Sequence, residues 1–138
     1  LPLYTQDLDS ESIPAYERVR AQLQAADAVL IVSPEHNRSM PAAVKNLLDI
    51  ASRPAGKSLW GGKKTAVITA SPGSYGGINS GLHIRQSLQA MSADVMIAPE
   101  VFLSRAHTAL ADGQVSDART AAFLNKFAAA FYGWAQAE

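Results

Sequence analysis

Cysteine is absent from the 138 residues, which excludes disulfide bonds, thiol chemistry and thiolate metal sites. An excess of either charge is absent too, because 12 acidic residues balance 12 basic ones. This balance gives no electrostatic reason to expect nucleic acid or an anionic membrane as a partner. No apolar run approaches the length of a membrane span, and no signal peptide is visible. We therefore expect a cytoplasmic protein without nucleic-acid or membrane partners.

Two common nucleotide-binding fingerprints are also missing, because neither a P-loop pattern nor Gly-x-Gly-x-x-Gly occurs. Hydrophobic residues make up 48% of the chain and charged residues only 17%, a composition that argues against disorder. A chain of this length fits one domain with a buried core, which we place over residues 1–138. The opening Leu1–Tyr4 has no methionine and is typical of a domain interior, so we expect a piece of a longer sequence.

The most informative stretch is AVLIVSPEHNRSMPAAVKN, residues 28–46. Its apolar start, Ala28–Val32, predicts a strand buried on both faces, as in a parallel sheet. The polar loop Pro34–Ser39 follows, and Pro41 then suits an early helix position with Ser39 as N-cap. Open parallel α/β sheets present their ligand sites at such loops, beyond the carboxyl ends of strands.

The rest of the chain alternates helix and strand. Leu1–Asp9 is predicted to be an extended or loop segment, followed by a helix with Pro14 in its first turn and Ser10 or Ser12 as its cap. The strand and helix described above come next, and that helix ends before Pro54. The remaining predicted elements, in chain order, are a strand at Thr65–Ala70, a helix over Asn79–Ser92, a strand at Asp94–Ala98 with Val101–Leu103 as a ragged extension, a turn at Asp112-Gly113 and a last helix capped by Ser116 or Asp117. This order predicts a parallel sheet covered on both faces. Three strands are few for such a sheet, so we expect a further strand–helix unit upstream.

A second polar loop, Ser71–Gly77, follows the second strand, and its glycines allow a ligand to approach closely. From the residues alone, each loop is as well explained as an ordinary connection or a tight turn. Arg38 is equally a solvated side chain or a contact to a ligand or neighbouring subunit. We expect Lys63-Lys64 to be a solvated strand entrance, and Leu59-Trp60 to lie in a loop folded against the surface. No metal site is predicted, because no histidine has a partner at ligand spacing.

Taken together, the loops resemble the NADPH-dependent FMN reductase family, which includes bacterial chromate and quinone reductases. The motifs that carry the resemblance are Pro34-Glu35-His36-Asn37-Arg38-Ser39, Lys45-Asn46, Ser52-Arg53-Pro54, and Ser71-Pro72-Gly73 with Gly76-Gly77. The resemblance extends across essentially the whole chain, although His36 stands where the family usually has tyrosine. The family's phosphate-binding Gly-Ser-x-Arg loop has no counterpart here, and we expect it to lie upstream.

The resemblance implies a flavodoxin-like, three-layer α/β/α fold, of which this chain covers about three of the five strands. It implies FMN as cofactor and NAD(P)H as co-substrate, with electrons passed to a quinone, free flavin or a metal oxyanion such as chromate. No catalytic side chain is implied, because the flavin performs the chemistry. The implied cofactor-binding residues are Pro34, Glu35, His36, Asn37, Arg38, Ser39, Ser71, Pro72, Gly73, Gly76 and Gly77. A homodimer or homotetramer is implied as the assembled form.

Two other functions are compatible with these residues. One is a truncated flavodoxin-like module that binds no flavin and serves in assembly, where a partner chain covers an exposed edge strand. The other is a flavodoxin-type electron carrier that does not oxidise NAD(P)H. The Pro-Glu-x-Asn loop at residues 34–37 favours the reductase over the carrier.

Overall fold

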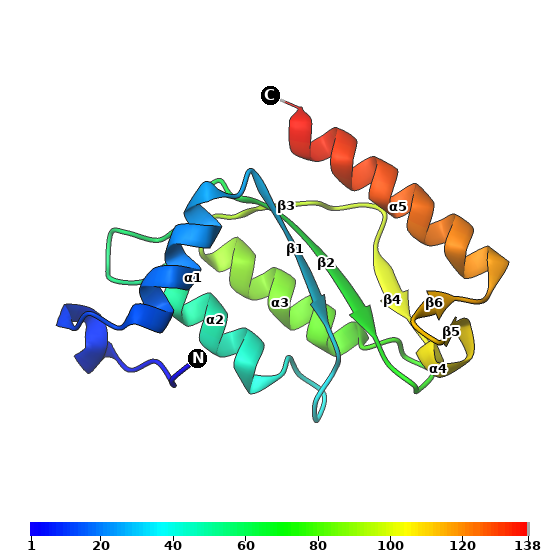
Figure 1. Cartoon of the computed structure of the whole chain (residues 1–138), viewed down its shortest axis with the longest axis horizontal. Coiled ribbons are helices and arrows are strands. Elements are labelled where there is room, and N and C mark those ends of the chain that lie inside the picture. The colour runs from blue at the N-terminus through cyan, green and yellow to red at the C-terminus, as the bar shows by residue number, and fades with distance from the viewer. Residues whose placement is uncertain (138) are drawn as a thin grey trace.

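In the computed structural model, which describes residues 1–137, helices pack on both faces of a twisted parallel sheet (Figure 1). The helices are η1 (Gln6–Ser10), α1 (Pro14–Ala25), α2 (Ala42–Ser52), α3 (Ile78–Ala90), α4 (Ala106–Ala109) and α5 (Ala118–Gln136). The strands are β1 (Ala28–Ser33), β2 (Lys64–Ala70), β3 (Asp94–Val95), β4 (Val101–Leu103), β5 (Leu110–Ala111) and β6 (Gln114–Val115). Among the residues described, no helix is both long enough and apolar enough to cross a membrane.

The predicted parallel α/β architecture is confirmed. β1 and β2 pair in parallel from Ala28↔Lys64 to Ser33↔Thr69. The third strand is interrupted, because β3 pairs with the first residues of β2 and β4 with its last ones. The Met96 N–H still donates to the Thr65 carbonyl at 3.0 Å, and residues 97–100 lie outside the strands. The predicted turn at Asp112-Gly113 closes the separate β5–β6 hairpin, and both of its residues have positive φ.

One buried charge secures this interruption. The Arg85 guanidinium on α3 donates a hydrogen bond of 2.7 Å to the Met96 carbonyl, and its Nε lies 3.8 Å from the exposed Glu100 carboxylate. Burial lowers the pKa of Arg85, and the negative charge of Glu100 partly offsets this effect. The segment between β3 and β4 is thereby tied to α3.

Two hydrophobic clusters hold the layers together. One lies between the sheet and α1–α3 and is centred on Ile31, Leu48 and Val67, while the other lies under α5 around Phe127. Trp60, predicted to lie against the surface, is instead fully buried in the first cluster, and its indole N–H donates to the Leu48 carbonyl at 3.0 Å. The connector that carries Trp60 therefore belongs to the core.

The prediction that β1 is buried on both faces is wrong. Leu30 and Val32 are 41% and 64% exposed, although Ile31 between them is buried. Their register partners on β2 are Ala66 and Ile68, and these do contact the cluster under α5. The helix covers this face over β2 and β4 but leaves β1, the edge strand, bare on the same side.

Several predicted helix caps are also wrong. Ile13 and Pro41 occupy the N-cap positions of α1 and α2 without side-chain caps. Ser12 instead donates to the Glu17 carboxylate, and the Ser39 hydroxyl bonds to the ring of His83. The segment Leu1–Asp9 is not wholly irregular, because it runs into η1, which Thr5 caps. Asp117 does cap α5, accepting the Thr120 N–H at 2.7 Å.

Lys63 and Lys64 are not solvated strand ends. The Lys63 ammonium donates to the Ala26 carbonyl at the end of α1. The Lys64 ammonium donates to the Trp134 carbonyl at 3.0 Å and to the Ala137 carbonyl, and it lies 5.7 Å from the Trp134 ring. Adjacent lysines thus satisfy carbonyl groups at the ends of helices on opposite faces of the sheet, where a positive charge is favourable.

Lys64→Met should lower the free energy of unfolding by about 1 kcal/mol, because it removes a charge and hydrogen bonds from the C-terminal end of α5. Urea unfolding followed by tryptophan fluorescence measures the change. Lys126→Met is the matched control, since it removes the same charge from an exposed site within α5. Equal effects of the two substitutions would contradict the capping role.

Candidate functional site

The two predicted ligand loops lie side by side at the carboxyl edge of the sheet. Pro34–Ser39 leaves β1 and Ser71–Gly77 leaves β2, and these strands are parallel neighbours (Figure 1). The end of β4 reaches the same edge, because the Ser71 N–H donates to the Leu103 carbonyl at 3.0 Å. The arrangement expected for an open α/β sheet is therefore present.

The first loop is a tight two-residue turn. The backbone groups of His36 and Ser39 exchange two hydrogen bonds of 3.0 Å. Asn37 and Arg38 between them have φ values of 49° and 67°, in the left-handed region. Asparagine adopts this conformation more readily than most residues, which is a signal for the turn that the sequence analysis did not use. The turn holds the side chains of His36, Asn37 and Arg38 at an exposed position.

Glu35 connects this loop to the helix that follows the second loop. Its Oε2 accepts the backbone N–H groups of Asn79 at 2.9 Å and Ser80 at 3.2 Å. The N-cap residue of α3 is Gly77, which has no side chain to accept these groups. Glu35 therefore caps α3 from 44 residues away in sequence, where the helix dipole favours its negative charge.

Ser80 adds a second connection and was missed by the sequence analysis. Its hydroxyl is fully buried and donates to the Pro34 carbonyl at 2.9 Å. It also lies 3.5 Å from the hydroxyl of Ser33, the last residue of β1. No local sequence pattern marks Ser80, because its partners are more than forty residues away. The first loop and α3 consequently form one rigid unit.

The second loop is held by the end of the sheet. The Gly73 carbonyl accepts the Arg105 N–H, and the Gly76 carbonyl accepts the Thr69 hydroxyl at 2.8 Å. A Cβ atom on Gly76, whose φ is 61°, would lie 2.4 Å from the carbonyl oxygen of Phe102. At Gly73 the nearest such contact is 3.4 Å and φ is not positive. Packing within the chain therefore requires glycine at position 76, whereas Gly73 has open space.

Tyr75 at the tip of the second loop faces Arg38 of the first. The Arg38 guanidinium lies 5.4 Å from the centre of the Tyr75 ring, and Tyr75 as a residue is 67% exposed. Such a cation–π contact joins the two loops at the surface. Tyr75 was also missed by the sequence analysis, in which only the glycines and Ser71-Pro72 of this loop were considered.

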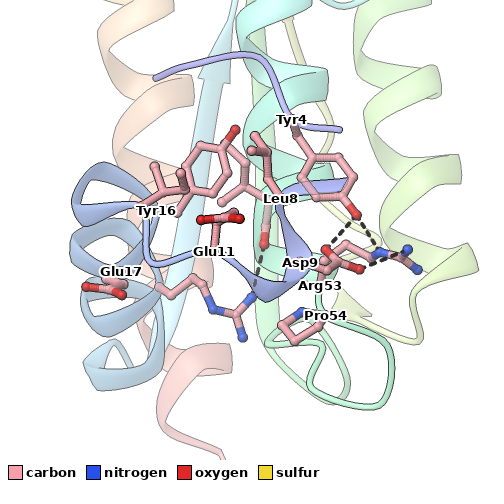
Figure 2. Close-up of a pocket in the computed structure, with 11 residues that line it drawn as sticks. Tyr4, Leu8, Asp9, Glu11, Tyr16, Glu17, Arg53 and Pro54 are labelled. Carbon is pink, nitrogen blue, oxygen red and sulfur yellow. Dashed lines mark hydrogen bonds and ion pairs between the residues drawn. The ribbon is translucent and has the colours of Figure 1, made fainter. Parts of the chain in front are cut away.

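A separate pocket of about 120 Å³ lies between η1, α1 and the C-terminal end of α2 (Figure 2). Three of its polar groups are paired with one another: Tyr4 donates to Asp9 at 2.8 Å, and Arg53 donates to the Tyr4 hydroxyl at 2.7 Å. Burial, opposed by the bond from Arg53 and aided by Asp9, raises the pKa of Tyr4. The first loop precedes the N-terminal end of α2, whose 11 residues span about 16 Å, whereas this pocket lies at its C-terminal end, and none of the predicted ligand residues lines the pocket.

The loop edge has the chemistry to hold a planar, polar ring. Asn37 offers both a donor and an acceptor, and His36 and Arg38 offer flat groups that stack, all from exposed positions. Glu35 and Ser39, by contrast, already have hydrogen-bond partners on α3. The exposed amide and flat side chains at this edge suit binding and orientation of a reactive ligand.

Comparison with known proteins gives consistent results. The family described as NADPH-dependent FMN reductase matches residues 1–108. A quinone reductase of Pseudomonas putida is 42% identical over 135 residues, which cover 97% of this chain and 73% of that protein. A 2-hydroxy-1,4-benzoquinone reductase of a Burkholderia species is 38% identical, with 97% and 74% covered. Among solved structures, this chain is similar to FerB of Paracoccus denitrificans, which is described as a flavoenzyme NAD(P)H:(acceptor) oxidoreductase. The two superpose with a TM-score of 0.90 at 37% sequence identity, and the match covers 99% of this chain and 75% of FerB.

Proposed function

Since the chain belongs to the NADPH-dependent FMN reductase family and has its flavodoxin-like fold, we propose that it is an FMN-dependent NAD(P)H oxidoreductase that reduces quinones. The observation that carries the proposal is the convergence of the two loops at the carboxyl edge of β1 and β2, joined by Glu35. In open α/β sheets this edge is where nucleotide cofactors bind.

The side chains at this edge fit the polar edge of a flavin ring. We propose that the loops Pro34–Ser39 and Ser71–Gly77 hold FMN, through the residues that the family resemblance indicates. The exposed Asn37 amide matches alternating donors and acceptors of a pyrimidine ring, while His36 stacks. FMN, when bound, supplies the redox chemistry, which ordinary side chains lack.

The protein's own contribution is orientation and charge. The Glu35 carboxylate is bound to the N-terminus of α3, so its negative charge is largely compensated there. Arg38 adds an exposed positive charge two residues away from His36. A net positive potential beside the ring favours the addition of electrons, because it stabilises the negative charge that reduction brings.

We propose further that residues 1–138 form a single domain whose sheet gains another strand at the edge of β1. The support is the exposed apolar pair Leu30 and Val32 on β1, a strand whose outer edge has no partner strand within residues 1–137. A strand there, with a helix over Leu30 and Val32, would place the flavin phosphate beside the first loop, in the manner of flavodoxin-like sheets.

We also propose electron acceptors other than quinones, namely free flavin and metal oxyanions such as chromate. The proposed assembled form is a homodimer or homotetramer, and the proposed location is the cytoplasm.

The purified protein, incubated with FMN and freed of excess ligand, should retain a flavin spectrum that bleaches anaerobically with NADPH and returns on addition of 1,4-benzoquinone. Asn37→Gly should raise the dissociation constant for FMN about tenfold, because it removes the amide and leaves a residue that suits φ 49°. Thermal unfolding serves as the control for folding. A folded protein that neither retains FMN nor oxidises NADPH would contradict the proposed function and favour the assembly module.

A further inference from the structure

Arg38 occupies a backbone position that favours glycine over residues with long side chains. It is the second residue of the two-residue turn and has φ 67°, where glycine is the residue that such turns favour. The backbone hydrogen bonds of the turn do not use its side chain. The backbone conformation disfavours arginine at this position, so we attribute the presence of arginine to an interaction of its guanidinium group.

That guanidinium is positioned but not neutralised. Its central carbon lies over the Tyr75 ring, 5.4 Å from the ring centre. Within residues 1–137 the ion pairs are Lys45–Asp49, Arg53–Asp9 and Arg85–Glu100, and Arg38 takes part in none of them. The junction of the loops therefore carries uncompensated positive charge on an exposed aromatic platform.

A stacked guanidinium with free N–H groups is suited to a phosphate dianion, which it binds through paired hydrogen bonds. The ring face of Tyr75 suits a flat base. A phosphomonoester attached to an adenine nucleoside combines both features. NADPH carries such a group, the 2′-phosphate, and NADH does not, so an arginine near the ribose selects between them.

We propose that Arg38, held by Tyr75, binds the 2′-phosphate of NADPH and gives the enzyme its preference for NADPH over NADH. The proposal rests on the proposed function, because it assigns the co-substrate of the same site. It makes Arg38 a residue of co-substrate specificity and Tyr75 the residue that positions it.

The test compares kcat/KM for NADPH and NADH in the same preparations, since their ratio does not depend on how much flavin is bound. Arg38→Gln should lower the NADPH:NADH ratio about tenfold, the loss expected for a charge-assisted contact. Arg38→Gly should do the same and cannot strain the turn, because φ 67° suits glycine. Tyr75→Ser should lower the ratio less. Arg18→Gln, which removes the same charge from an exposed site on α1, should leave it unchanged.

A binding experiment separates this proposal from the activity. By calorimetry, 2′,5′-ADP should bind the wild-type protein about tenfold more tightly than 5′-AMP, and this difference should disappear in Arg38→Gly. If NAD(P)H oxidation is absent while the difference is found, the proposed function fails and the phosphate site stands. An unchanged kinetic ratio, or equal binding of the two nucleotides by the wild type, overturns the proposal for Arg38.

Discussion

Gly76→Ala is expected to lower the free energy of unfolding by about 3 kcal/mol or more, a much larger change than that expected for Gly73→Ala in the same loop. The new Cβ would lie 2.4 Å from the carbonyl oxygen of Phe102 and 2.5 Å from its carbonyl carbon. Both are backbone atoms of β4, so a side-chain rotation cannot relieve the clash. The φ of 61° adds about 1–2 kcal/mol of cost for any residue with a Cβ.

Gly73→Ala is the matched control in the same loop, with an expected change below about 0.5 kcal/mol. Its Cβ would meet only the Ser71 hydroxyl at 3.4 Å, an ordinary contact. Urea unfolding of both variants measures the difference. If Gly76→Ala is as stable as Gly73→Ala, then the second loop does not pack on β4 as the structure shows it.

The same pair of substitutions bears on the site. The Gly76 carbonyl accepts the Thr69 hydroxyl, and Tyr75 is its chain neighbour. A shift of the loop at Gly76 would therefore move the Tyr75 ring away from Arg38. We expect Gly76→Ala, where it remains folded, to lower the NADPH:NADH ratio, while Gly73→Ala tests whether the space beside Gly73 is needed by the ligand.

The alternation of helices and parallel strands was predictable, because it depends on local patterns. Apolar runs such as Ala28–Val32 and Thr65–Ala70 are too short for helices and lie between turn residues. The exposed face of β1 was not predictable from its own residues. Leu30 and Val32 have the composition of a buried strand, and only the placement of α5 over β2 and β4 reveals that nothing within residues 1–137 covers them.

Contacts between distant residues account for the other errors. Ser39 looks like a helix cap, but its hydroxyl bonds to His83, which is 44 residues away. Trp60 lies in a stretch of glycine and lysine, yet the indole finds the Leu48 carbonyl at the core. Propensity describes a residue's neighbours along the chain, and tertiary packing overrides it in each of these cases.

The candidate site was predicted in its location and only partly in its members. Two polar loops after neighbouring parallel strands must lie at one edge, so the sequence indicates their meeting. It does not indicate which side chains face outward and which join the loops. Tyr75 and Ser80 became visible as parts of the site through their contacts with Arg38 and Pro34.

Glu35→Ala should lower the free energy of unfolding by about 2 kcal/mol, through a connection that no local pattern marks. The substitution leaves the backbone N–H groups of Asn79 and Ser80 without their acceptor, and the fully buried Ser80 has little access to water. Glu35→Gln keeps an acceptor oxygen but loses the charge that the helix dipole favours, so a smaller loss of about 0.5–1 kcal/mol is expected.

Glu11→Ala controls for the removal of a carboxylate from an exposed position, and should change stability little. Hydrogen exchange locates the Glu35 effect: the amides of Asn79 and Ser80 should exchange faster in Glu35→Ala than in Glu35→Gln, with the core of β2 unchanged. Because the first loop is joined to α3 through this carboxylate, FMN retention should fall in the same order as amide protection. Normal protection in Glu35→Ala, or weakened FMN binding equal in both variants, would show that Glu35 acts on the flavin directly and does not position the loops.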